Sequence, residues 1–159
     1  MKPLAEAKQE FFEQARRKGA NCPCCGRFGK VYKRKIHSGM AAILVLLYRH
    51  QNLGFTHVLT LVSAAMTPSV AAHVGGGDFA KLRYWGLIEE ETHEVRGKKR
   101  GNGQWRITGA GAQFVEGTTT VQRHVWVYSG QALGFHGEHI TIHDALGDKF
   151  SYAELMRSS

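Results

Sequence analysis

Three cysteines within four positions are the residues of this sequence with the clearest chemical potential. Cys22 and Cys25 stand in the order Cys-Pro-x-Cys-Gly, which is typical of one half of a zinc ribbon, where a tight turn brings two thiolates onto one tetrahedral ion. Structural zinc needs four ligands, and the sequence has no second Cys-x-x-Cys pair. We take His37 as the best third ligand, because Cys24 directly precedes Cys25 and would bind only with strain. The fourth ligand would be a distant histidine or a residue of another subunit.

The same turn has a second interpretation that involves no metal. Cysteine is a small side chain that is often buried, so the three thiols can simply complete a compact turn. Two alternatives therefore stay open: a structural zinc held by Cys22, Cys25 and His37, or a turn without any cofactor.

A second group of potential ligands lies near the C-terminal end and consists of His136, Glu138, His139, His143 and Asp144. If residues 138–143 form a strand, His139 and His143 point the same way but lie about 13 Å apart, because each residue advances ~3.3 Å. One metal ion cannot bridge that distance, so we interpret these histidines, and the isolated His124, as surface or interface residues. The sequence also lacks the common phosphate-binding, dinucleotide-binding and nucleophile motifs. We therefore expect no enzyme; a metal-dependent hydrolase is the least supported class.

The third group is basic and could bind phosphate. Four cations, Arg96, Lys98, Lys99 and Arg100, fall within five positions in a glycine-rich segment between two strand-like stretches. This spacing predicts a hairpin whose flexible tip adapts to a nucleic-acid backbone.

Just before this hairpin, residues 78–85 are predicted to form a helix capped by Asp78. Its inward residues are Phe79 and Leu82, with Trp85 at the edge, and its exposed face offers Lys81, Arg83 and Tyr84 as candidates for contacts with base edges. Glu89, Glu90 and Glu91 follow closely and would repel phosphates. They favour the alternative of a protein interface that also uses Tyr84 and Trp85.

The whole composition is compatible with one small intracellular protein that has an anionic partner. The chain has 159 residues, 43% of them hydrophobic, and 21 Lys and Arg against 13 Asp and Glu, which gives a net charge of +8. No secretory signal is recognisable. The longest apolar run, Met40–Tyr48, is less than half of the ~20 residues that a membrane span requires. We expect a cytoplasmic protein, without a membrane partner.

Apolar spacing and turn residues predict the elements that position these groups. In chain order, we expect helices at 3–18 and 38–49, a strand at 55–62, helices at 67–74 and 78–85, strands at 87–91 and 104–107, and a helix at 108–115. Two or three strands and a last helix, with a capping box of Ser151 and Glu154, complete the chain.

Two segments add a resemblance to a known family. KLRYWGLIEE, followed about fifteen residues later by QWRITGAGAQF, resembles the L-x-x-x-G-L-I … W-x-L-T-x-x-G-x-x-F pattern of winged-helix proteins such as the MarR-like regulators. The resemblance covers residues 38–117 and implies a winged helix-turn-helix that binds double-stranded DNA. The whole chain, with its cysteine turn, is also similar to uncharacterised proteins encoded by bacteriophages and prophages, which would place it in a bacterial host cell.

We thus expect an α+β fold with three parts: an N-terminal helix and zinc-knuckle-like turn at 1–37, a winged-helix domain at 38–117, and a β-rich extension at 118–159 packed on that domain. The expected function is DNA binding with a regulatory role in transcription. The alternative is a module that uses the winged-helix fold to bind a host or phage protein.

Overall fold

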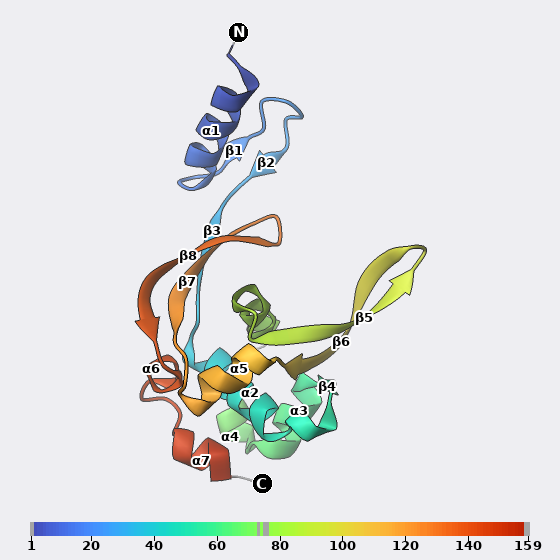
Figure 1. Cartoon of the computed structure of the whole chain (residues 1–159), viewed down its shortest axis with the longest axis vertical. Helices are drawn as coiled ribbons and strands as arrows, with labels where there is room; N and C mark the ends of the chain where they lie inside the picture. Colours follow the sequence, from blue (N-terminus) through green and yellow to red (C-terminus); the bar gives the residue numbers. More distant parts are fainter. Residues whose placement is uncertain (1, 73, 75–76, 158–159) are drawn as a thin grey trace. The chain divides into compact units, whose positions relative to one another are not determined.

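The computed structural model describes residues 2–72, 74 and 77–157 (Figure 1). It has a mixed α+β fold with several small antiparallel sheets, and this confirms the α+β class predicted from the sequence. None of the helices in these ranges is both long and apolar enough to cross a membrane. The chain forms two compact units: a first unit of residues 1–35 and 124–137, and a second unit of residues 36–123 and 138–159.

The first unit combines one helix with short strands. Helix α1 (Leu4–Ala15) precedes a small hairpin of β1 (Ala20–Asn21) and β2 (Phe28–Gly29), and β3 (Tyr32–Lys35) pairs antiparallel with β7 (Val121–Tyr128), beside β8 (Gln131–Ile140). The aromatic rings of Phe11, Phe12 and Tyr128 meet edge to face at centroid distances of 5.7–6.2 Å. Gly29 lies against Phe11 and Tyr128, where any larger side chain would collide. These contacts join α1 to β2 and β7.

The second unit is built around helix α2 (Ser38–Arg49), in which every residue from Gly39 to Leu47 is buried. This confirms the predicted helix and its position in the core. The remaining elements of the unit are η1 (Gln51–Leu53), β4 (Thr56–His57), α3 (Val58–Ala65), α4 (Pro68–Ala71), η2 (Gly77–Trp85), β5 (Ile88–Val95), β6 (Lys98–Ile107), α5 (Gly109–Glu116), α6 (Ile142–Leu146) and α7 (Tyr152–Arg157).

A three-stranded antiparallel sheet with the order β4-β6-β5 belongs to the second unit. Its long hairpin turns at Arg96 and Gly97, whose φ angles of 54° and 77° are typical of the two-residue turns that match strand twist. The ladder continues up to this turn, since Val95 is paired with Lys98. The prediction of a flexible tip across residues 96–103 is therefore wrong: Lys98, Lys99 and Arg100 lie on a strand.

The predicted strand at 55–62 is also wrong. Only Thr56 and His57 are paired, and α3 begins at Val58. The His57 imidazole accepts a hydrogen bond from Thr60 N at 3.4 Å and so caps the helix. A short run of apolar and β-branched residues does not by itself distinguish a strand from a buried helix. The helices predicted at 67–74 and 108–115 do begin where expected, because Thr67 caps α4 and Thr108 caps α5.

The C-terminal segment differs from its prediction as well. Strand β8 ends at Ile140, and Thr141 caps α6 through a capping box with Asp144. The Thr141 backbone N–H donates to Asp144 Oδ2 at 2.9 Å, and this hydrogen bond lowers the pKa of the Asp144 carboxyl group. Residues 138–143 are therefore not one strand, and the 13 Å argument for His139 and His143 does not hold. Ser151 Oγ accepts from Glu154 N at 3.3 Å, which is one of the two bonds of the capping box predicted there.

Candidate nucleic-acid interface

Helix η2, which carries three of the predicted contact residues, is a 3-10 helix along its whole length. With three residues per turn, side chains three apart lie in one line. Phe79, Leu82 and Trp85 form this line and are all buried, with exposed fractions of 8%, 0% and 9%. The expectation of Trp85 at the edge assumed an α-helix and is wrong, and Trp85 Nε1 donates to Gln122 O at 2.7 Å. Trp85 is thus a core residue and no anchor for a protein partner.

The predicted contact residue Lys81 lies on a second line of η2 side chains, three positions after Asp78, and forms an ion pair with it. Lys81 Nζ lies 2.8 Å from Asp78 Oδ1, and His37 Nε2 lies 3.2 Å from Asp78 Oδ2. The hydrogen bond from Lys81, and after it the one from His37, lowers the pKa of Asp78. A base or phosphate that recruits Lys81 must therefore compete with this carboxylate.

Arg83 and Tyr84 do come together on the outer side of η2. The Arg83 guanidinium lies 5.1 Å from the centroid of the Tyr84 ring and donates to Tyr84 Oη at 3.3 Å. Arg83 is exposed and Tyr84 half-buried. This planar pair has the donors and the flat surface that contacts with base edges require.

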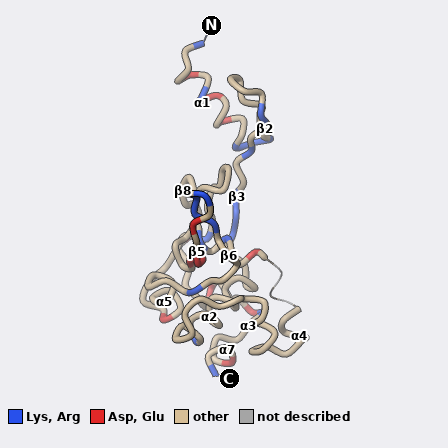
Figure 2. Tube along the Cα trace, turned by 90° about the vertical axis from the view of Figure 1, so that its right-hand side faces the viewer, with Lys and Arg blue, Asp and Glu red and all other residues tan. Residues whose placement is uncertain are grey.

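The hairpin of β5 and β6 mixes charges of both signs, as Figure 2 shows. Five cations and four glutamates lie between Ile88 and Ile107. Three of these four glutamates have partners on β6: Glu89 is paired with Arg106, Glu90 accepts from Gly103 N at 2.9 Å, and Glu94 stands opposite Lys99. Of the three glutamates expected to repel phosphates, only Glu89 is neutralised by a cation, Arg106, within the described part of the chain.

The other cations near the turn have different neighbours. Lys98 lies opposite Val95 and Arg100 opposite His93, so neither faces a carboxylate in the ladder. Because side chains alternate along a strand, Lys98 and Arg100 share one face, and Lys99 lies on the other face with Glu94. The four predicted basic residues are all exposed, but only Lys98 and Arg100 share a face without a carboxylate directly opposite them.

The net charge of the protein lies mainly in the first unit and not in the predicted hairpin. Residues 1–35 and 124–137 contain ten Lys and Arg against three Glu, and hence seven of the eight net positive charges. The second unit, with the hairpin, is nearly balanced. Figure 2 shows Lys and Arg residues beside β2 and along β3. The basic run at residues 27–35 was the available signal in the sequence.

The cysteine turn connects β1 and β2 in the first unit. The backbone N–H groups of Cys25 and Cys24 are directed at the Cys22 sulfur and lower the pKa of that thiol. Gly26, at a φ of +76°, permits its own N–H to donate to Cys22 O at 2.8 Å. Such an arrangement favours a thiolate, the form that binds metals.

The other predicted ligand, His37, belongs to the second unit and is bonded to Asp78. Within the described residues, no group of three or more His, Cys, Asp or Glu side chains is arranged to hold a metal ion. Zinc at Cys22, Cys25 and His37 stays a prediction.

The zinc prediction has a direct test. We predict that any zinc found in the purified protein by elemental analysis is structural and held by Cys22 and Cys25. The double variant Cys22→Ser, Cys25→Ser should then lose it and melt at a lower temperature, because metal binding stabilises the turn that provides the ligands. Cys24→Ser is the matched control and should retain the metal. Unchanged metal content and melting temperature in the double variant would contradict the assignment.

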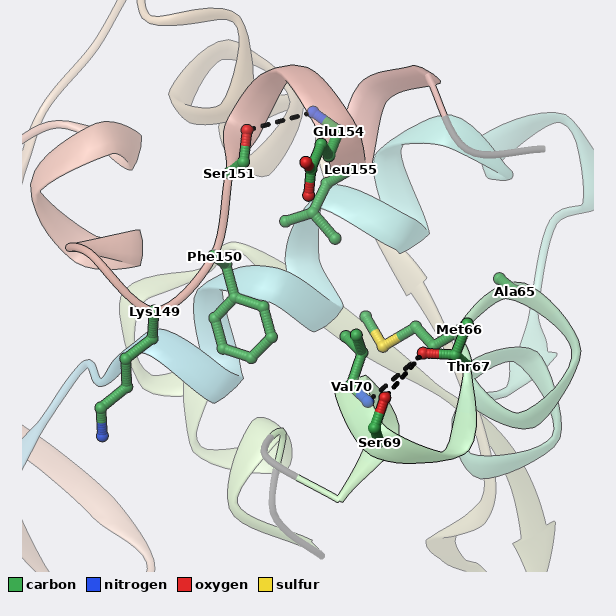
Figure 3. Close-up of a pocket in the computed structure, with 10 residues that line it drawn as sticks. All are labelled: Ala65, Met66, Thr67, Ser69, Val70, Lys149, Phe150, Ser151, Glu154 and Leu155. Carbon is green, nitrogen blue, oxygen red and sulfur yellow. Dashed lines mark hydrogen bonds between the residues drawn. The ribbon is translucent and has the colours of Figure 1, made fainter.

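A cavity of about 570 Å³ lies in the second unit between α3–α4 and the α6–α7 segment (Figure 3). Met66 and Val70 line it from one side, Phe150 and Leu155 from the other. Two of its hydroxyl groups already act as helix caps, on Thr67 and Ser151. The lining therefore suits an apolar group rather than acid–base chemistry.

Comparison with known proteins identifies no relative: no family model, no curated protein and no solved structure matches this chain.

Proposed function

We propose that this protein binds double-stranded DNA through a winged-helix arrangement in its second unit, with a regulatory role. The observation that carries the proposal is the element order α2-β4-α3-α4-η2-β5-β6-α5 combined with the sheet order β4-β6-β5. In a winged helix, a short strand pairs with the far strand of a hairpin, and the hairpin directly follows the recognition helix. Here β4 pairs with β6, and η2 leads into β5 across Gly86, whose φ is +72°.

In this arrangement the two candidate contact surfaces have different tasks. Arg83 and Tyr84 on η2 would contact base edges in the major groove, with Lys81 joining if it leaves Asp78. Arg96, Lys98 and Arg100 at the hairpin turn would contact phosphates, which fixes the orientation of the protein without sequence information. The shared face of Lys98 and Arg100, and not the net charge of the hairpin, supports this role.

The salt dependence of DNA binding tests the hairpin. Each phosphate contact contributes about 0.9 to the slope of log affinity against log salt concentration. We therefore expect Lys98→Ala, Arg100→Ala to lower that slope by about 1.8 for a random DNA duplex. Lys99→Ala should change it much less, since Lys99 lies opposite Glu94. Folding should be nearly unaffected in all variants, because exposed substitutions usually change stability by less than ~0.5 kcal/mol.

Two outcomes would speak against the proposal. A slope change for Lys99→Ala half as large as that for Lys98→Ala, Arg100→Ala would mean that every cation counts equally and the hairpin acts through bulk charge. An unchanged slope in well-folded variants would remove the hairpin from the interface and favour a protein partner instead. Since Trp85 is buried, such a partner would contact Tyr84 and the exposed carboxylates.

A further inference from the structure

One face of the sheet in the first unit combines aromatic rings with lysines. In the antiparallel register, Lys33 lies opposite Trp126 and Lys35 opposite His124. Residues directly opposite each other, or two apart on one strand, share a face. The His136 ring of β8 lies 6.1 Å from the Trp126 ring and 6.2 Å from the His124 ring, between centroids. We name these five residues, Lys33, Lys35, His124, Trp126 and His136, the β3–β7 face.

The β3–β7 face is accessible. Lys33, Lys35 and His136 are exposed, and His124 and Trp126 are half-buried. The Lys33 ammonium lies 5.7 Å from the Trp126 centroid, near the ~6 Å limit of a cation–π contact. This lysine is therefore held only weakly over the ring and is available to an anion.

The surroundings of the face are strongly cationic. Residues 27–35 contain Arg27, Lys30 and Arg34 in addition to Lys33 and Lys35, and neither this segment nor residues 124–137 contain an Asp or Glu. An anionic ligand is thus attracted without a competing carboxylate on β3 or on these parts of β7 and β8.

We propose that the β3–β7 face binds single-stranded nucleic acid, with unpaired bases stacked on Trp126 and His136 and phosphates held by Lys33 and Lys35. Sites for single strands combine two components, flat aromatic rings and basic side chains. The rings stack on the bases, and the basic side chains attract the negative charge that every nucleotide carries. A base within a duplex already stacks on its neighbours, so this surface selects unpaired nucleotides. DNA and RNA strands share this chemistry.

This site is independent of the proposed hairpin contact with duplex DNA, because it belongs to the other unit and uses other residues. The two proposals therefore fail separately. Lys98→Ala, Arg100→Ala should leave single-strand binding unchanged, and changes in the β3–β7 face should leave the slope for duplex DNA unchanged.

Tryptophan fluorescence gives a specific measurement of this contact. Of the three tryptophans, Trp85 and Trp105 are buried and Trp126 is half-buried, so a stacking base quenches mainly Trp126. The probes are oligo-dT and oligo-U of about 16 nucleotides, the upper end of common site sizes. We expect both to quench the fluorescence, and a hairpin-free DNA duplex to do so much less. Binding of only one of the two single strands would identify the natural type of strand.

The variants separate stacking from charge. Trp126→Leu is expected to weaken single-strand binding about 5- to 150-fold, whereas Trp126→Phe keeps a ring and most of the affinity but abolishes the quenching. Lys33→Ala, Lys35→Ala should lower the salt slope by about 1.4. Arg16→Ala, Arg17→Ala removes the same charge from the end of α1 and is the matched control, with circular dichroism as the check of folding.

Three results would overturn the proposal. The first is wild-type affinity of a folded Trp126→Leu variant, and the second is duplex DNA binding as tightly to this face as oligo-dT and oligo-U. The third is an equal loss in the Arg16→Ala, Arg17→Ala control and in Lys33→Ala, Lys35→Ala, which would mean that the first unit attracts anions without a defined stacking site. If Trp126→Leu does not fold, two comparisons decide the question: quenching that persists in Trp126→Phe, or an equal loss in the lysine and arginine variants, overturns the proposal.

Discussion

Phe79→Ala is expected to lower the free energy of unfolding by about 3–5 kcal/mol, the usual cost of removing a large aromatic side chain from a core. Phe79 is 8% exposed, and its ring meets Trp105 edge to face, with centroids 5.8 Å apart and planes at 85°. The contact connects η2 to β6. Denaturant unfolding measures the loss, and an unchanged m-value would show that the variant unfolds in the same two-state manner.

The same helix provides the control for Phe79→Ala. Arg83 is exposed and its partner Tyr84 is a neighbour on η2, so Arg83→Ala should cost no more than ~0.5 kcal/mol while it weakens duplex binding. Similar losses of stability in Phe79→Ala and Arg83→Ala would contradict the division of η2 into a core side and a contact side.

Gly111→Ala should destabilise the second unit by about 1–3 kcal/mol or more, as overpacked cores do. A methyl group at this position of α5 would overlap the carbonyl oxygen of Leu87 and also press on the Ile107 side chain. Leu87 O accepts the backbone N–H of Thr108 at 3.0 Å, so moving α5 away also strains the bond at its own start. A thermal melt or denaturant titration measures the loss.

Gly109→Ala is a matched control within the same helix. A methyl group there meets nothing within 4 Å, and replacing a helical glycine by alanine stabilises a compatible site by about 0.4–1 kcal/mol. Opposite signs for the two substitutions are therefore expected. A loss at Gly109→Ala as large as that at Gly111→Ala would mean that α5 does not approach Leu87 as described.

Helix α2 shows which parts of the fold are predictable from sequence. Its residues Met40–Leu47 are apolar on every side, and such a run is buried whatever its exact orientation. The caps Thr67 and Thr108 were equally clear, because a threonine oxygen satisfies a backbone N–H that would otherwise lack a partner. The cap of α3 was missed because His57 accepts its hydrogen bond through a ring nitrogen, which is not among the usual capping groups.

The positions of the site residues were harder to predict. A 3-10 helix and an α-helix of the same sequence bury different residues, and nothing in the sequence around η2 indicated the tighter period. The consequence was the wrong placement of Trp85. In the hairpin, glycines at 101 and 103 suggested a loose tip, whereas the strands continue and Glu90 fills the space over Gly101.

The β3–β7 face could not be predicted, because it depends on strand pairing across a long stretch of sequence. The basic run at Lys33–Lys35 and the aromatic strand around Trp126 are each visible in the sequence. What the sequence does not give is the register that places Lys33 opposite Trp126. Long-range pairings of this kind are set by the whole fold and leave no local pattern.

The same pairing imposes an order on synthesis at the ribosome. Strand β3 emerges well before its partner β7, since all of α2 to α5 lies between them. At about 5–20 residues per second, translation leaves β3 without its partner for several seconds. A nascent strand with open hydrogen-bonding groups invites aggregation, and lysine is a common residue for preventing it. Strand β3 also stays at the edge of the finished β3-β7-β8 sheet, so Lys33 and Lys35 disfavour pairing with other chains both before and after β7 is made.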